Sequence, residues 1–125
     1  QKKVKLIDTS CWVHALRASG RQEIRTKIKD LVENGKAGWC APVRLELWAG
    51  VGRDPEADVL RHYASVLPDF PVEPEVWNLA DTLAIRGRRR GKSAPSMDIL
   101  IAACARHHRV EVEADDEHFD WLMTV

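Results

Sequence analysis

Short apolar runs alternate along the chain with longer segments in which apolar residues recur every three or four positions. The short runs are bounded by polar or turn-forming residues and are too brief for helices, so they predict strands. Four strands are expected, at residues 3–7, 37–42, 69–74 and 109–115.

The segments between these runs have the spacing of helices that bury one face. One of them has an apolar stripe between residues 24 and 32 and reaches a typical stop signal at Asn34-Gly35. Proline suits the first turn of a helix, which favours helices after Pro42 and at Asp54-Pro55, with Asp54 as the N-cap. Helices are therefore expected at residues 8–19, 24–33, 43–51, 54–67 and 75–86, the last ending at Gly87. Another should contain residues 98–105, and a short turn should follow at 117–122.

Strands that alternate with helices predict a parallel sheet with helices on both faces, the three-layer α/β/α class. The chain has no internal repeat, low-complexity segment or flexible linker, and 125 residues suffice for one core. We therefore expect a single domain over residues 1–125. In this class, ligands bind beyond the carboxyl ends of the strands, where the connections to the helices converge.

Acidic residues occur at the positions that should meet at this edge of the sheet. They are Asp8 directly after the first strand, Glu46 one turn into the helix after the second, Asp98 in the first turn of an apolar helix, and Asp115 or Asp116 after the last strand. Separate segments are thus expected to bring carboxylates to one rim.

Each of these aspartates has an alternative explanation as a helix-capping residue. A carboxylate at a helix start interacts with free N–H groups and the helix dipole, an effect of about 0.3–1 kcal/mol. Glu46 fits this explanation poorly, because Val43, Leu47 and their neighbours should leave little of its helix facing water, and a lone buried carboxylate is costly. Mg²⁺ or Mn²⁺ would compensate clustered carboxylates, because both ions prefer oxygen ligands.

Composition and charge exclude several other classes of protein. The 19 basic and 19 acidic residues give a net charge of zero, which argues against a nonspecific nucleic-acid coat. The three cysteines lack zinc or disulfide spacing and are expected to be free and buried. The histidines at 14, 107, 108 and 118 have no partner at a zinc spacing, so we expect surface or packing roles. The sequence has no apolar signal-peptide core or membrane-length apolar run, which predicts a cytoplasmic protein.

Five of the seven residues from 86 to 92 are cations, and they precede the helix that contains Asp98. Such a run is either an ordinary solvated turn or a surface that holds nucleic-acid phosphates. On the second interpretation the RNA-binding residues are Arg86, Arg88, Arg89, Arg90 and Lys92.

Four motifs, in order, resemble the PIN-domain nucleases, and in particular the VapC-type toxins of bacterial toxin-antitoxin pairs. "LIDTS" at 6–10 resembles the opening strand and its D-T-[NS] signature, and "ELWAG" at 46–50 resembles E-L-x-x-G. "DILIAACA" at 98–105 is similar to the family's D-x-L-I-A-A-x-A helix, and "DDEHF" at 115–119 is similar to D-x-x-F. The chain departs from the family pattern at Ala114, where a Thr or Ser is frequent.

The resemblance implies an endoribonuclease that uses Mg²⁺ or Mn²⁺, forms a dimer and is blocked by a cognate antitoxin. It assigns catalytic and metal-binding roles to Asp8, Glu46, Asp98 and Asp116, with Thr9 and Ser10 in support. Apolar residues beside the acidic rim, Trp12, Val13 and Leu16, are candidates for contacts with partner chains. The alternative is a catalytically silent PIN-fold binding module whose acids only cap helices.

Overall fold

The computed structural model describes residues 3–125, so the first two residues of the predicted domain lie outside it. In chain order its elements are β1 (Lys5–Ile7), α1 (Thr9–Leu16), α2 (Gln22–Glu33), β2 (Ala37–Gly38), α3 (Ala41–Gly50), α4 (Asp54–Val66), α5 (Pro74–Arg89), α6 (Ser96–His107), β3 (Val112–Glu113) and α7 (His118–Leu122).

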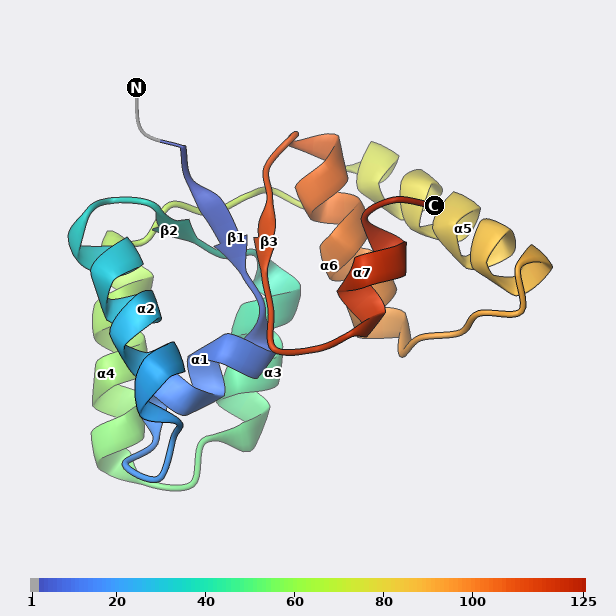
Figure 1. Ribbon diagram of the computed structural model, residues 1–125. Helices are drawn as coiled ribbons and strands as arrows, with labels where there is room; N and C mark the ends of the chain where they lie inside the picture. The colour runs from blue at the N-terminus through green and yellow to red at the C-terminus, as the bar shows by residue number, and fades with distance from the viewer. Residues whose placement is uncertain (1–2) are drawn as a thin grey trace.

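β1 is the central strand of a parallel sheet with the order β2-β1-β3 (Figure 1). Leu6 pairs with Gly38 of β2 on one side and with Val112 of β3 on the other. Because the strands are parallel, their carboxyl ends lie at one edge of the sheet, and Asp8 follows β1 at that edge.

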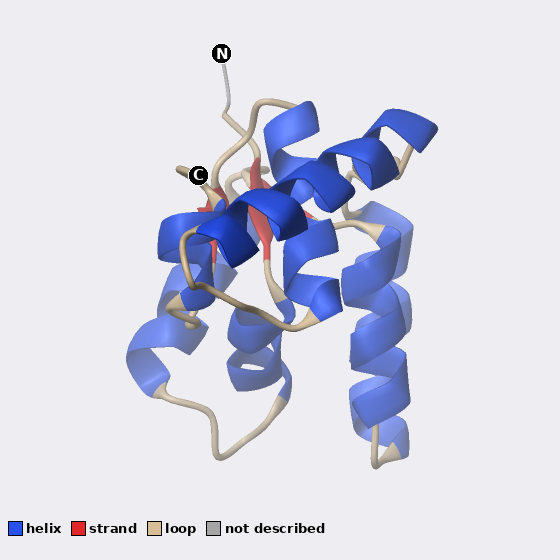
Figure 2. Cartoon of the chain, turned by 90° about the vertical axis from the view of Figure 1, so that its right-hand side faces the viewer, coloured by secondary structure: helices blue, strands red, loops and turns tan. Residues whose placement is uncertain are grey.

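Helices flank this sheet, which confirms the predicted α/β class. Figure 1 shows α1 to α4 grouped on one side of the molecule and α5 to α7 on the other, with the strands between them. Seen from the side of α5, helices cover the strands (Figure 2). The core is the layer in which the buried residues of β1 meet these helices, among them Trp12 of α1 and Ile101 of α6, both without exposed surface.

α6 is the most enclosed helix, as its sequence predicts. All six residues from Leu100 to Ala105 are buried, because the helix is apolar on every side and must pack against neighbours all round. The same burial includes Asp98 in the first turn. Among residues 3–125, no helix is both long and apolar enough to cross a membrane.

Several predicted elements differ from the structure. The expected strands at 37–42 and 109–115 are much shorter, since β2 is Ala37–Gly38, α3 already begins at Ala41, and β3 is Val112–Glu113. Residues 69–74 form no strand; they contribute a single parallel bridge between Asp69 and Trp39. Pro71 and Pro74 lack the N–H groups that a longer ladder needs. Asp54 is the first residue of α4 and not its N-cap, a position that Arg53 occupies without a side-chain hydrogen bond.

Gly87 also differs from its predicted role, because α5 continues through it to Arg89. The helix instead ends with Gly91 at a φ of 70°, where the N–H of Lys92 donates to the Gly87 carbonyl at 2.8 Å and that of Gly91 to Arg88 at 3.1 Å. Gly87 is required for packing: a Cβ there would lie 2.6 Å from two ring atoms of Trp121. Three of the five cations of the basic run, Arg86, Arg88 and Arg89, therefore lie on α5 and not in a loop.

We expect Gly87→Ala to destabilise the protein, although alanine is the better helix former. Forcing the Trp121 ring to move should cost about 1–3 kcal/mol, against a gain in helix propensity of at most about 1 kcal/mol. The matched variant Gly87→Ala with Trp121→Leu removes the obstructing ring. Urea denaturation of the two single variants and the double variant would contradict this account if their free energies of unfolding were additive.

Candidate active site

Asp8 acts both as a helix cap and as a member of an acidic cluster. Its Oδ2 accepts hydrogen bonds from the Ser10 backbone N–H at 3.1 Å and the Ser10 hydroxyl at 2.7 Å, which caps α1. Its Oδ1 is buried without a hydrogen-bond partner among the described residues. Burial raises the pKa of Asp8, and the negative charge of Glu46 adds to this rise, while the bonds from Ser10 oppose it.

Glu46 reaches the same region from α3, where the Thr9 hydroxyl donates to its Oε1 at 2.7 Å. Thr9 and Ser10 thus each hold one acid of the cluster. The helix around Glu46 is less enclosed than predicted, since Leu45 is 64% and Trp48 39% exposed and Glu46 itself is half-buried.

Asp98 and Asp116 form the most perturbed pair of the cluster. Burial, a hydrogen bond with Asp116 and the charges of Asp116 and Asp8 together raise the pKa of Asp98 to about 7. Burial also acts to raise the pKa of Asp116, but hydrogen bonds from Asp98 and the His118 backbone lower it below its usual value. We therefore expect the two carboxyls to share a proton near neutral pH when no cation is bound.

His118 belongs to this pair, although the sequence predicted a surface or packing role. Its Nδ1 lies 2.8 Å from Asp116 Oδ1 and 3.3 Å from Asp98 Oδ2. The sequence signal for this role is the position of His118, two residues after Asp116. α7 begins at His118, so this side chain lies close to the turn that holds Asp116. Asp116 Oδ1 also accepts the His118 backbone N–H at 2.9 Å, at the start of α7, whose N-cap is Glu117.

Asp115 points away from the cluster. Its carboxylate lies 2.7 Å from an Arg21 guanidinium nitrogen and 3.2 Å from His14 Nε2. Its backbone N–H donates to the Ser10 hydroxyl at 2.8 Å, which connects the turn after β3 to the residue that caps α1. Of the two adjacent aspartates, Asp116 is therefore the one beside Asp98.

The donor atoms of this cluster suit a divalent cation. Asp98, Asp116 and His118 each offer a ligand atom within 4.8 Å of the others, a set that does not include Asp8 or Glu46. Within residues 3–125, Asp8 Oδ1 is buried without a hydrogen-bond partner. Asp98 Oδ2 and His118 Nδ1 are also buried and lie 3.3 Å apart, but neither forms a hydrogen bond with a described residue. Buried polar atoms left without partners are costly, and a cation would satisfy them.

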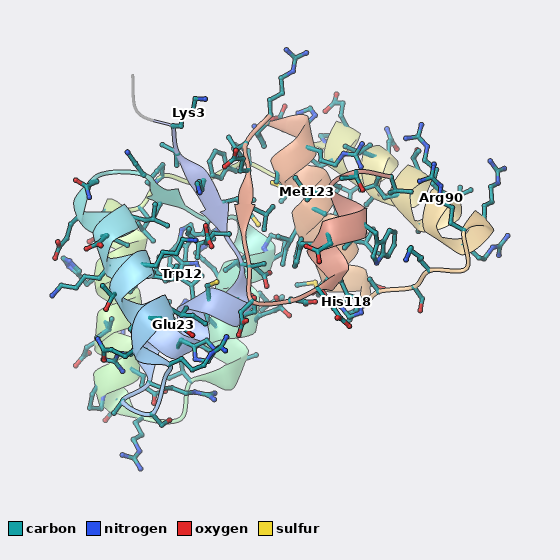
Figure 3. All side chains as sticks on the ribbon, in the orientation of Figure 1. Lys3, Trp12, Glu23, Arg90, His118 and Met123 are labelled. Atoms are coloured by element: carbon teal, nitrogen blue, oxygen red, sulfur yellow. The ribbon has the colours of Figure 1, made fainter. Side chains whose placement is uncertain are left out.

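A cavity of about 460 Å³ is lined by both His118 and Lys92, the last cation of the basic run, but by none of the carboxylates of the cluster. Lys92 and Ser93 line one part of it, and His118 and Trp121 line another. Figure 3 shows His118 at the start of α7 and Arg90 at the end of α5, with the loop that contains Lys92 between α5 and α6. Arg88, Arg89 and Arg90 are exposed.

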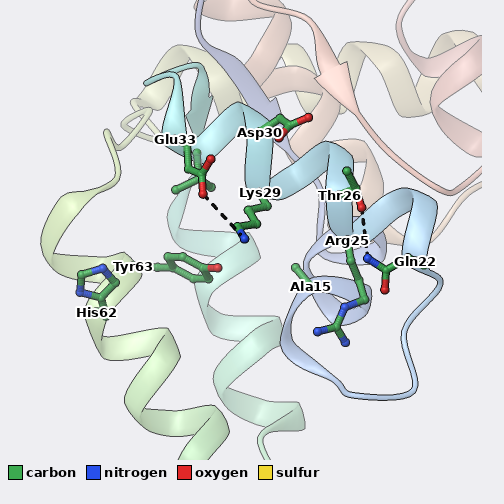
Figure 4. Close-up of a pocket in the computed structure, with 10 residues that line it drawn as sticks. Ala15, Gln22, Arg25, Thr26, Lys29, Asp30, Glu33, His62 and Tyr63 are labelled. Atoms are coloured by element: carbon green, nitrogen blue, oxygen red, sulfur yellow. Dashed lines mark hydrogen bonds and ion pairs between the residues drawn. The ribbon is translucent and has the colours of Figure 1, made fainter.

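A second cavity, of about 630 Å³, lies between α2 and α4 and does not touch the acidic cluster (Figure 4). Its wall carries charges of both signs, including Lys29 and Glu33, which pair at 3.9 Å. Volume alone is therefore not our criterion for the candidate site; we base it on the convergence of the carboxylates.

Comparison with known proteins agrees with this geometry. Residues 5–122 match the family model of the PIN domain. The ribonuclease VapC11 of Mycobacterium tuberculosis is 31% identical over 125 aligned positions, which cover 96% of this chain and 92% of the relative.

Solved structures of similar fold have lower sequence identity. VapBC-5 from M. tuberculosis, a member of the VapBC family of toxin-antitoxin systems, is 19% identical with a TM-score of 0.71 and covers 98% of this chain and 92% of that chain. VapC20 from M. tuberculosis, a toxin that cleaves the sarcin-ricin loop, is 17% identical with a TM-score of 0.72, covering 96% and 95%. These structures support the fold that the sequence predicted.

Proposed function

Because the chain belongs to the PIN-domain family and is homologous to VapC ribonucleases, we propose that it is a metal-dependent endoribonuclease, the toxin of a toxin-antitoxin pair. The observation that carries the proposal is the buried Asp98, which lies with the half-buried Asp116 and His118 in one group of possible metal ligands and has an oxygen without a hydrogen-bond partner among the described residues. Such strain is retained where a site needs it for function.

In this proposal Asp98 and Asp116 hold the cation, Asp8 presents its free Oδ1 to it, and Thr9 orients Glu46 at the rim. Oxygen-rich ligands favour Mg²⁺ or Mn²⁺. A bound ion would supply activation of water and stabilisation of the departing oxygen of an RNA phosphodiester. Ser10 keeps the other oxygen of Asp8 occupied, which fixes the direction of the free one. His118 Nδ1 lies beside both carboxylates and offers the cation a further ligand from α7.

A cleavage assay with total RNA and added Mg²⁺ tests the proposal. The native chain should cleave RNA, and Asp8→Asn should reduce the rate by about 10²–10³-fold, because the lost charge is aimed at the reacting centre. Asp81→Asn, which neutralises an exposed acid on α5, is the matched control and should cleave normally. A silent binding module would show no cleavage by any variant, or equal traces in native chain and Asp8→Asn.

We propose that the basic run binds RNA on its way to the acidic cluster, through Arg86, Arg88, Arg89, Arg90 and Lys92. The exposure of three of these arginines and the cavity shared by Lys92 and His118 support this path. Unpaired loops of structured RNA are the expected substrate, since a duplex cannot bring its backbone into a recessed site as readily.

Replacing Arg88, Arg89 and Arg90 with alanine should weaken RNA binding and make it less dependent on salt, because three phosphate contacts are lost. Metal affinity, measured by calorimetry, should not change. The control variant Lys29→Ala, Lys36→Ala, Arg53→Ala removes the same charge from other exposed positions. If the slope of log affinity against log salt is equal in both variants, the run is an ordinary solvated helix end.

The proposed partners are a cognate antitoxin and a second copy of the chain. The prediction that Trp12 contacts a partner chain is wrong. Trp12 is fully buried, and its Nε1 donates to the Ile7 carbonyl at 2.9 Å. Val13 and Leu16 do line a small cavity together with Glu46, so a partner segment seated there would reach the acidic rim. An arginine from that segment would pair with the carboxylates in place of a metal ion. Light scattering of the purified chain tests the dimer, and a monomer at high concentration would contradict it.

A further inference from the structure

Two histidines and a glutamate meet at the end of α6 opposite to Asp98. His107 is the last residue of α6, His108 follows it as the C-cap, and Glu73 is the N-cap of α5. Nine residues of helix separate His107 from Asp98, a rise of about 14 Å. This group is therefore separate from the acidic cluster.

The three side chains converge on one point. His107 Nε2 lies 3.5 Å and His108 Nε2 3.8 Å from the same oxygen, Glu73 Oε1. All three residues offer ligand atoms within 4.8 Å of one another. Ligands bound at about 2.0–2.1 Å around a tetrahedral ion lie roughly 3.3–3.4 Å apart, so a small closure of these side chains forms a coordination shell.

We propose that Glu73, His107 and His108 form a second metal site, selective for Zn²⁺ and similar transition-metal ions over Mg²⁺. Two imidazole nitrogens and one carboxylate are the donor set of borderline metals, whereas Mg²⁺ prefers a shell made of oxygen. With three protein side chains, a fourth position remains for water or another oxygen. The half-buried histidines and the exposed Glu73 leave the site accessible from solvent.

An ordinary ion pair explains this arrangement less well. Glu73 could pair with both histidines only if both were protonated, which would place two like charges on rings whose centroids are 4.9 Å apart. One divalent ion instead lets both neutral rings donate lone pairs and satisfies the carboxylate. The C-terminal end of α6 also carries partial negative charge, which favours a cation there.

His108 has one further contact, which binding of an ion must change. Its Nε2 lies 2.7 Å from the Pro71 carbonyl, so without metal it carries the ring proton and donates to that oxygen. Coordination through Nε2 moves the proton to Nδ1 and frees the Pro71 carbonyl, which then offers an oxygen beside the ion. The metal would thus join the 71–73 segment to the end of α6.

Zn²⁺ calorimetry on the full chain tests this site, in the variant Asp98→Asn, Asp116→Asn so that the acidic cluster does not compete. We expect one Zn²⁺ per chain, and a loss of affinity of at least about tenfold when either Glu73→Gln or His107→Gln is added. His62→Gln removes an exposed histidine of α4 and should leave Zn²⁺ binding intact. Circular dichroism identifies any variant that fails to fold. Because Glu73→Gln and His107→Gln are added separately, each tests the zinc site independently of the other.

The site is overturned if the acidic-cluster variant binds no Zn²⁺, or if Glu73→Gln and His107→Gln bind it as tightly as their parent does. His107→Gln in the otherwise native chain should still cleave RNA in Mg²⁺ at the native rate. The zinc site and the proposed nuclease activity can therefore fail separately.

Discussion

Asp98→Asn is expected to abolish RNA cleavage while leaving the metal-free chain as stable as the native protein or more stable. Asparagine keeps the size of the side chain but removes the carboxylate of the buried Asp98, which lies beside Asp116. The rate should fall by about 10²–10³-fold or more, because the cation loses a ligand at the reacting centre. Stability should not fall, because the repulsion between Asp98, Asp116 and Asp8 is relieved.

Thermal melts with EDTA and with Mg²⁺, beside one cleavage assay, separate a shared site from independent helix caps. If the acids form one site, Mg²⁺ should stabilise the native chain by mass action and stabilise Asp98→Asn much less. Asp81→Asn, outside the cluster, should respond to Mg²⁺ as the native chain does. Retained cleavage by Asp98→Asn, with the Mg²⁺ effect intact and a stability change within about 1 kcal/mol, would mean that Asp98 only favours the helix start.

The metal-free native chain is expected to lose stability as the pH rises from about 4 to 7, with Asp98→Asn as the reference. The pKa of Asp98 is raised to about 7 in the folded chain, against 3.8 as the ordinary value. A raised folded-state pKa contributes stability that is fully present below the unfolded-state pKa and is lost as the pH passes through the folded-state pKa. The lost stability should be on the order of 3 kcal/mol.

The difference between the two proteins reports the titration of the pair Asp98 and Asp116, because the titrating groups outside this pair are common to both. Asp116 acts in the opposite direction, since its pKa is lowered, but its contribution is lost as the pH falls below about 4. Urea denaturation at several pH values should therefore give a steeper decline for the native chain. Equal pH slopes in both proteins would contradict a shared proton. Calorimetry in two buffers should also detect about one proton released when Mg²⁺ binds the native chain near pH 6.

The sequence by itself determined the order of the elements and the location of the main acids. Apolar spacing predicted the helices because it reflects which face of a helix packs against the core, as α6 shows. Alternation of strands with helices determined the parallel sheet, which places the residues that follow β1 and β3 at one edge. Asp8 follows β1 at that edge for this reason, and the charges of Asp8 and Asp116 both act on Asp98.

Only the tertiary structure decided which side chains lie in contact, both for residues adjacent in sequence and for residues far apart. The turn after β3 directs Asp116 toward Asp98 and Asp115 toward Arg21, and the sequence of two adjacent aspartates does not distinguish them. The sequence predicts that Gly87 ends a helix. In the structure Gly87 lies inside α5, where the Trp121 ring leaves no room for a Cβ atom.

The contacts of the histidines are the clearest example of what local sequence patterns do not predict. Glu73 is 34 residues from His107 in sequence, so no local spacing identifies their group, and only the packing of α5 beside α6 brings them together. His118 lies near Asp98 because α7 folds back after β3, a contact across 20 residues. The periodicity of apolar residues indicates which face of one element is buried. The contacts of these histidines depend on how separate elements pack, and the local spacing of residues does not predict that packing.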